Sequence, residues 1–258
     1  MAKRRVKTGL RRQRVPRGAQ REDRSRGPAQ RLGRWLWDWA KSISVALLLF
    51  LLIRTFAIET FTIDSGSMES TLLVGDFLVV NKAAYGAELP FTDIRLPGLG
   101  TPGRGDVVVL EPPLDTWQAP YVKRIVGLPG ERLAMRAGAL YVNGVRQHER
   151  YVQRMEPAGD YYDRRFEWQR GYLAPGVEVA TYKPTRDNWG PIRVPAGNYF
   201  VMGDNRDNSE DSRHWGFVDR ALIRGRPLII YYSFDRSRLR LVPWLTEVRW
   251  ERIGGLIQ

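Results

Sequence analysis

Hydrophobic residues divide the chain into a polar tail, one long apolar run and a body of short alternating segments. The uncharged run covers only residues 42–53, whereas a helix that spans a bilayer needs about 20 residues. A window over residues 40–58 holds 19 residues, with Lys41 and Arg54 near its ends, where both side chains can reach lipid headgroups. Three tryptophans suited to a membrane interface precede it: Trp35, Trp37 and Trp39. The pattern predicts one transmembrane helix within residues 35–60.

The pattern that follows is typical of β-structure. From residue 61 onward, short runs rich in Val, Ile, Tyr and Phe alternate with Gly and Pro. The predicted strands are 61–64, 77–81, 106–111, 121–126, 132–136, 139–142, 198–202 and 227–233. Asn143 and Gly144 predict a type I′ hairpin turn, because both residue types tolerate a positive φ. The body is therefore predicted to be all-β and mostly antiparallel.

One stretch of the body, residues 147–193, follows neither the strand period nor the helix period. Its aromatic residues are scattered, and we predict that it forms an inserted, smaller β lobe. The predicted organisation is a basic tail, a transmembrane anchor, the first part of the β body, the inserted lobe, and the second part of the body with a C-terminal segment. These parts cover residues 1–34, 35–60, 61–146, 147–193 and 194–258.

The net charge of +13 is concentrated in the tail. Residues 1–34 contain 13 basic and 2 acidic residues, so the other 224 residues have a net charge of only +2. Nucleic-acid binding would depend on this tail, which has no aromatic residue before Trp35 on which a base could stack. We therefore predict no nucleic-acid partner.

The basic tail also indicates an orientation. Residues 55–84 contain one basic residue, Lys82, so the positive-inside rule keeps the tail in the cytoplasm. The prediction is a single-pass protein of the cytoplasmic (inner) membrane, with its body on the outer face. The alternative is a cleaved secretion signal, because Thr-Phe-Ala at 55–57 fits a small-x-small cleavage site. A basic segment of more than thirty residues is long for such a signal, which favours a retained anchor.

Few residue types remain for catalysis. The chain has no cysteine, which excludes disulfides, thiolate metal sites and thiol nucleophiles. It has only two histidines, His148 and His214, so a metal site built from several imidazoles is not expected. We predict neither a metal nor any other cofactor. Covalent catalysis would then depend on Ser, Thr, Lys or a carboxylate.

The first candidate is the segment Ile-Asp-Ser-Gly-Ser-Met-Glu-Ser-Thr-Leu at 63–72. A serine after a glycine at a strand end, such as Ser67, can present its hydroxyl and its amide to a cleft. Ser65 lies two residues away, on the same side of an extended chain. Together they provide a nucleophile, a backbone N–H and a side-chain donor for an oxyanion. An ordinary polar turn has the same composition.

The second candidate is Lys123. Strand alternation puts Tyr121 and Ile125 on its own face, where apolar neighbours can exclude water from the amine. At a reference pKa of ~10.4 only about one lysine in 2,500 is neutral at pH 7, and burial lowers that pKa. A buried Lys123 could therefore act as a base. The alternative is an edge lysine that extends into solvent.

The third candidate is the loop at 203–216, in which acidic residues alternate with arginines. Calcium binding is disfavoured, because an EF-hand that began at Asp204 would have Arg206 at its third position and Ser209 where glycine is needed. A loop held by its own ion pairs could instead direct Ser209 at a neighbour. A solvated surface loop has the same composition.

In this order, the segments resemble bacterial type I signal peptidase, the leader peptidase, a family of serine proteases with a Ser–Lys dyad. The matching motifs are Ser-Gly-Ser-Met-x-x-Thr-Leu (65–72), Gly-Asp-Phe-Leu-Val-Val-Asn-Lys (75–82), Arg-Gly-Asp-Val-Val-Val (104–109), Tyr-Val-Lys-Arg-Ile-Val-Gly-Leu-Pro-Gly (121–130) and Gly-Asp-Asn-Arg-Asp-Asn-Ser-x-Asp-Ser-Arg (203–213). They cover the body from about 61 to 235 except for the 147–193 region.

The resemblance implies a membrane-anchored endopeptidase that removes signal peptides from exported preproteins after small residues. Ser67 would be the nucleophile and Lys123 the neutral general base of an acyl-enzyme mechanism. Ser65, with the Ser67 amide, would bind the oxyanion, and Ser209 would orient the Lys123 amine. Two residues would stabilise the loop of Ser209: Asp211 and Arg213. The residues that would bind the substrate are Phe61, Ile63, Met68, Leu72, Tyr121 and Val122.

Some positions depart from the family pattern or leave alternatives open. The family usually has proline where Ser70 stands, and a small or apolar residue where Asp64 stands. We expect Asp64 to point away from the cleft. His214 could replace Lys123 as the base, since histidine is the commonest one. A related self-cleaving repressor would need a DNA-binding helical domain, which residues 1–60 do not offer. The alternative function is a catalytically silent, membrane-anchored module that binds exported polypeptides.

Overall fold

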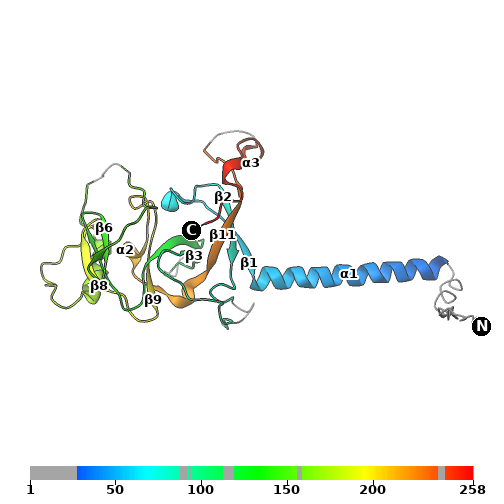
Figure 1. The fold of residues 1–258 in the computed structure, drawn as a ribbon, viewed down its shortest axis with the longest axis horizontal. Coiled ribbons are helices and arrows are strands. Elements are labelled where there is room, and N and C mark those ends of the chain that lie inside the picture. Colours follow the sequence, from blue (N-terminus) through cyan, green and yellow to red (C-terminus); the bar gives the residue numbers. More distant parts are fainter. Residues whose placement is uncertain are drawn as a thin grey trace, which may run out of the picture. The chain divides into compact units, whose positions relative to one another are not determined.

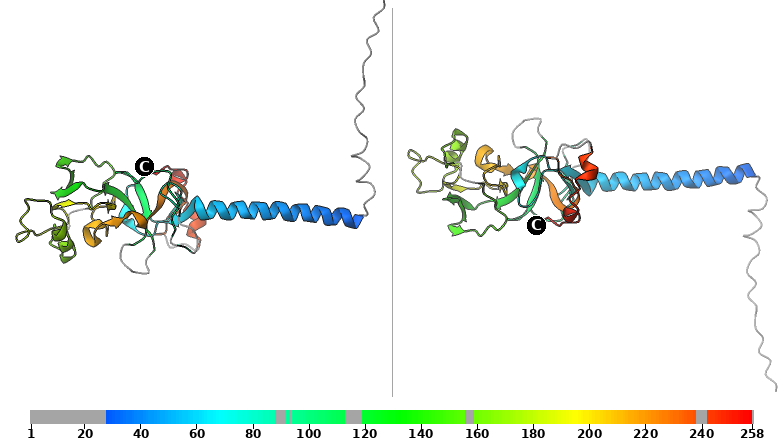
Figure 2. Two further views of the ribbon diagram at one scale, coloured as in Figure 1. Left: turned by 90° about the horizontal axis from the view of Figure 1, so that it is seen from below. Right: turned by 90° about the horizontal axis from the view of Figure 1, so that it is seen from above.

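Two antiparallel sheets form the body of the protein. The structure is a computed structural model that describes residues 28–87, 92, 94–112, 119–155, 159–237 and 242–257. The large sheet contains, in pairing order, β1 (Ile58–Thr62), β2 (Asp76–Asn81), β11 (Ile223–Ser233), β3 (Val107–Leu110), β4 (Tyr121–Gly127), β9 (Asn198–Met202) and β10 (Val218–Asp219). The small sheet contains β7 (Val145–Arg146), β6 (Ala139–Val142), β5 (Arg132–Arg136) and β8 (Trp189–Arg193). The two sheets lie at opposite ends of the body (Figures 1 and 2).

Every pairing between these named strands is antiparallel. Short helices lie between these strands and after the last one: η2 (Gly66–Met68), η3 (Arg164–Tyr172), α2 (Ser212–Trp215), η4 (Arg220–Leu222), α3 (Pro243–Thr246) and η5 (Trp250–Arg252). The prediction of an all-β, mostly antiparallel body with one preceding apolar helix is confirmed.

That helix, α1, covers Pro28–Phe56. Its section Leu32–Phe56 is long and apolar enough to cross a membrane, and its side chains are exposed. It begins seven residues before the predicted start at residue 35. Residues 1–27 of the predicted tail lie outside the described residues.

The body forms one compact unit from Leu52 onward, and its central strands are buried on both faces. Val107 and Val109 of β3 pack in one hydrophobic cluster with Leu72, while Val108 and Leu110 pack in another. This two-sided burial explains why β3 is a continuous run of apolar residues and not an alternating one.

Local signals predicted some elements better than others. The hairpin turn is confirmed, since Asn143 and Gly144 have φ values of 50° and 85° between β6 and β7. The strands β7, β8 and β10 were not predicted. The small sheet takes three of its four strands from before residue 147, so the predicted lobe at 147–193 supplies only β8 to it. The predicted domain boundaries stay a prediction.

Candidate active site

Ser67 lies in η2, within the turn that follows β1. Residues on both sides of the turn hold it against β2, since the amide of Ile63 donates to the carbonyl of Asp76 and the amide of Gly75 donates to the carbonyl of Ile63. The side chain of Ser67 is 7% exposed, and its carbonyl accepts a hydrogen bond from the amide of Asn205. The turn therefore fixes the hydroxyl at the edge of the core.

Lys123 projects from β4 toward this turn. Its Nζ lies 2.7 Å from Oγ of Ser67 and 5.5 Å from the centre of the Tyr121 ring, and the residue is only 4% exposed. Burial lowers the pKa of Lys123 to about 8, against a smaller opposing effect of the charge of Asp211. Near pH 8, therefore, about half of the Lys123 amines are neutral. Each lies within hydrogen-bonding distance of the Ser67 hydroxyl.

The loop after β9 packs against this pair. Arg213 donates to both carboxylate oxygens of Asp211 at 2.8 Å, and both side chains are buried. Burial alone would raise the pKa of Asp211, but the charge and hydrogen bonds of Arg213 outweigh it and hold the pKa well below its ordinary value. Asp211 also accepts the amide of Gly203 and caps α2. These contacts hold the loop that contains Ser209.

The Oγ of Ser209 is buried and has no hydrogen-bond partner among the described residues. It packs against Gly203, where any Cβ would collide with this Oγ and with the carbonyl oxygen of Ser67. Gly203 therefore permits close contact between the loop and the turn of Ser67. The predicted bond from Ser209 to the amine of Lys123 is absent from this arrangement, and its orienting role stays a prediction.

Ser65 immediately precedes η2. Its Oγ lies 3.3 Å from Oγ of Ser67, on the exposed side of the turn.

His214, the alternative base, and Asp64, a charge near the serine segment, make contacts away from the Lys123 amine. Nδ1 of His214 accepts a hydrogen bond from the amide of Asp211 in the capping box of α2, and its ring packs against Phe166. Burial lowers the pKa of His214. The carboxylate of Asp64 is paired with Arg236, and Asp64 is not among the main charges that act on the pKa of Lys123.

A cleft of about 390 Å³ leads to the dyad. Five of the six predicted substrate-binding residues line it: Phe61, Ile63, Met68, Tyr121 and Val122. Leu72 does not, because it is fully buried in the hydrophobic cluster behind the cleft. Asp64 also borders the cleft, while its carboxylate is paired with Arg236, so the expectation that it points away stays a prediction.

The buried ion pair of Arg124 with Asp204 at the site was not predicted from the sequence. Arg124 donates to both carboxylate oxygens of Asp204, which also accepts the hydroxyl of Thr71. The pair joins the strand of Lys123, the loop of Ser209 and the turn of Ser67. All three residues lie inside the quoted motifs, and their place in those motifs was the only indication in the sequence that they belong to the site. Among the described residues, no group of three or more His, Asp or Glu side chains could hold a metal ion.

Replacing Lys123 with methionine tests whether the amine is buried at a free-energy cost. Below pH 8 the wild-type amine is charged in both states, so the folded state bears the full penalty of about 3 kcal/mol. Between pH 8 and about 10.5 only the unfolded state is protonated, and wild-type stability rises with pH. Lys123→Met should therefore exceed the wild type in unfolding free energy at pH 7, by an amount that shrinks toward pH 10. Denaturant titrations should show no such trend for the exposed control Lys183→Met, and a pH-independent difference for Lys123→Met would contradict the assignment.

Three comparisons relate the chain to known proteins. A family model described as signal peptidase, peptidase S26, matches residues 36–232. The signal peptidase I of Pseudomonas fluorescens is 36% identical over 226 residues, which cover 83% of this chain and 78% of that protein. The signal peptidase I of Bacillus licheniformis is 33% identical over 204 residues, with 79% and 92% covered. A signal peptidase I structure from Enterococcus faecalis V583 matches 49% of this chain and 96% of that chain, at 32% identity and a TM-score of 0.33. The family model and the two relatives confirm the resemblance and the prediction of a serine protease: the chain belongs to the signal peptidase family, peptidase S26.

Proposed function

We propose that the protein is a membrane-anchored endopeptidase that cleaves signal peptides from exported preproteins, with Ser67 as the nucleophile and Lys123 as the general base. The observation that supports this most is the distance of 2.7 Å between Nζ and Oγ in a buried site, where burial lowers the pKa of Lys123 to about 8. Among the described residues, His214 forms no hydrogen bond with Ser67, and its Nδ1 accepts the amide of Asp211 instead.

The proposed reaction begins when the neutral amine accepts the hydroxyl proton of Ser67 while Oγ bonds to the scissile carbonyl carbon. The carbonyl oxygen becomes an oxyanion, to which Oγ of Ser65 and the amide of Ser67 donate. Each such donor contributes about 3 kcal/mol to the barrier reduction. The C–N bond then breaks as the ammonium of Lys123 returns the proton to the leaving amine. A water molecule, deprotonated by Lys123, attacks the ester and restores the hydroxyl of Ser67.

The cleft supports an extended substrate. A peptide laid between the segments at 60–65 and 119–123 could pair its backbone with both, while alternate side chains enter the cleft. Ile63, Met68 and Tyr121 would surround the residue before the cut, and Phe61 and Val122 the residue two positions earlier.

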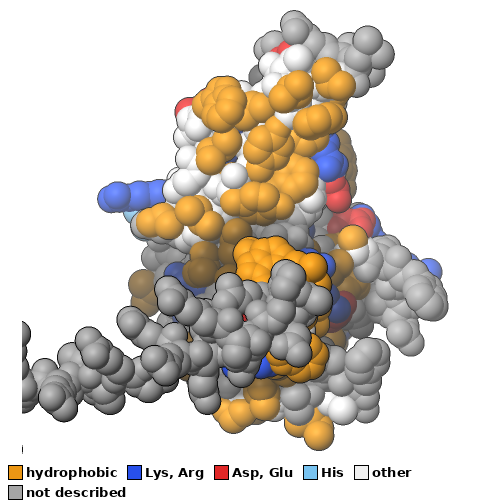
Figure 3. Space-filling view, turned by 90° about the vertical axis from the view of Figure 1, so that its right-hand side faces the viewer, with side chains coloured by type: hydrophobic (Ala, Val, Ile, Leu, Met, Phe, Trp, Pro, Cys, Tyr) orange, Lys and Arg blue, Asp and Glu red, His pale blue; other side chains and the backbone are white. Residues whose placement is uncertain are grey.

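Membrane anchoring is supported by α1 and, independently, by an apolar surface on the body. Large hydrophobic side chains that are 41–74% exposed lie on β11 and on the C-terminal residues that follow it: Leu228, Tyr231, Trp244, Leu245, Trp250 and Leu256. Figure 3 shows hydrophobic side chains gathered on this face. Exposed patches rich in tryptophan are suited to the interface of a bilayer. The proposed location is the outer face of the cytoplasmic membrane, with the tail inside.

Cleavage of a purified precursor tests the proposed chemistry. The full chain in detergent should cut a precursor with small residues at the first and third positions before the site. Ser67→Ala and Lys123→Ala should each lower the rate by at least about 10³-fold, because the dyad acts as a unit. His214→Ala should still cut, although loss of the capping box lowers its stability. Cutting by Lys123→Ala but not by His214→Ala would reverse the assignment of the base, and a folded wild type that never cuts would favour the binding module.

Protease accessibility tests the proposed orientation. In bacterial cells whose outer surface is exposed, added protease should digest the body while an N-terminal epitope tag stays protected until the cells are lysed. The protein should also remain with the membrane pellet after alkaline extraction, because α1 is embedded. Release by alkali, or a body that is protected in intact cells, would contradict the proposal.

A further inference from the structure

One short segment outside the motifs, residues 149–153, contacts all three parts of the candidate site. The carbonyl of its residue Tyr151 accepts a hydrogen bond from the hydroxyl of Ser70, in the turn that follows Ser67. The Tyr151 ring lies 4.0 Å from the guanidinium of Arg124, the neighbour of Lys123 on β4. We call residues 149–153 the bridging segment.

The third contact is with the loop that contains Ser209. The amide of Gln153 donates to the carbonyl of Asp204 at 2.9 Å, and the amide of Arg206 donates to the carbonyl of Gln153 at 3.0 Å. Between them, the amide of Asn205 donates to the carbonyl of Ser67. The loop is therefore bound on one side by the bridging segment and on the other by the nucleophile turn.

Glu149 connects these contacts through its carboxylate. It accepts two hydrogen bonds from Arg206, which is 1% exposed, and one from the hydroxyl of Tyr151 at 2.9 Å. Burial and the neighbouring Glu149 raise the pKa of Tyr151, so its hydroxyl stays a donor. Because a buried guanidinium without a carboxylate is costly, Glu149 fixes where Arg206, and the loop with it, can lie.

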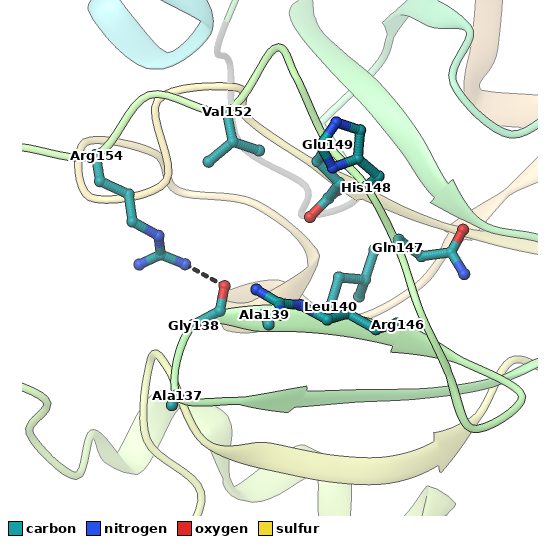
Figure 4. A pocket seen from close by; sticks show the side chains of 10 residues that line it. All are labelled: Ala137, Gly138, Ala139, Leu140, Arg146, Gln147, His148, Glu149, Val152 and Arg154. Atoms are coloured by element: carbon teal, nitrogen blue, oxygen red, sulfur yellow. Dashed lines mark hydrogen bonds between the residues drawn. The ribbon is translucent and has the colours of Figure 1, made fainter.

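The far end of the segment is attached to the small sheet. Figure 4 shows Arg154 beside the β5–β6 hairpin, with its guanidinium bonded to the carbonyl of Gly138. The same guanidinium donates to Asp187 at 3.0 Å, and Val152 faces the hollow beside Leu140. The small sheet thus provides a fixed frame for the bridging segment.

Ser70 has an unusual backbone conformation. Its φ is +90°, a region that residues other than glycine rarely adopt. The strained turn is held by the bond from its hydroxyl to Tyr151. A serine at this position therefore joins the nucleophile turn to the bridging segment.

We propose that the bridging segment positions the turn of Ser67, the strand of Lys123 and the loop of Ser209 relative to one another, with Glu149 as the main positioning residue. This assigns a task to the start of the 147–193 region. It rests on the proposed function, because the three parts matter together only in the Ser–Lys reaction.

Glu149→Gln in the full chain tests the proposal, because the amide keeps the shape of the side chain and removes its charge. The matched control is Glu167→Gln, since Glu167 also accepts a tyrosine hydroxyl and pairs with an arginine, but within the lobe. Glu149→Gln should lower kcat about tenfold and leave KM within twofold, measured well below its melting temperature. Glu167→Gln should change neither by more than twofold. Tyr151→Phe, which loses only one hydrogen bond, should lower kcat about threefold and remains informative if Glu149→Gln fails to fold.

Hydrogen exchange gives a readout that is independent of activity. The amides of Asn205 and Arg206 should exchange faster in Glu149→Gln than in the wild type or in Glu167→Gln. A lower melting temperature with unchanged kcat and unchanged exchange would overturn the proposal, as would equal losses of kcat in both variants. Cleavage by the wild type, and its loss in Ser67→Ala, test the proposed function separately. If the wild type does not cut, the exchange rates alone test the role of the bridging segment.

Discussion

Three buried arginines lie around the candidate dyad and each has a carboxylate partner, whereas the buried Lys123 has none within the described part of the chain. Arg124 pairs with Asp204, Arg206 with Glu149, and Arg213 with Asp211. Among the described residues, Lys123 forms no ion pair within 4 Å, and its polar neighbour is a neutral hydroxyl. An amine in such a site gives up its proton more easily than one in water, because burial penalises the charged form. The ion pairs around it hold the site together without supplying Lys123 with a counter-charge.

The same arrangement explains how a β fold serves this chemistry. The dyad residues come from a turn after β1 and from the middle of β4, which belong to one sheet. The loop after β9, the strand next to β4, brings Ser209 and Asp211 to the same place. Close contact at Gly203 and the buried pair of Arg124 with Asp204 then connect these pieces. The candidate substrate cleft borders the candidate dyad and Ser65.

The candidate dyad could be predicted because the motifs are long and occur in order. Most strands could be predicted because short runs of Val, Ile, Tyr and Phe are bounded by Gly and Pro. The strands β7 and β10, which have two residues each, and β8, whose Gly190 and Pro191 are typical of loops, were not predicted. Leu72 was assigned to the cleft on the basis of the resemblance, whereas the turn after Ser67 points it into the core. The bridging segment has no local pattern, because its contacts with the site join residues 27 to 81 positions apart.

The most direct test of this account is the titration of the Lys123 side chain itself. NMR of the full chain in detergent, with lysine labelled at Cε and the signal assigned through Lys123→Met, would follow this one amine from pH 6 to 11. Burial of the amine predicts a midpoint near 8. A midpoint near 10.4, the ordinary value for lysine, would show that the amine is hydrated and charged at neutral pH and would contradict its role as the base.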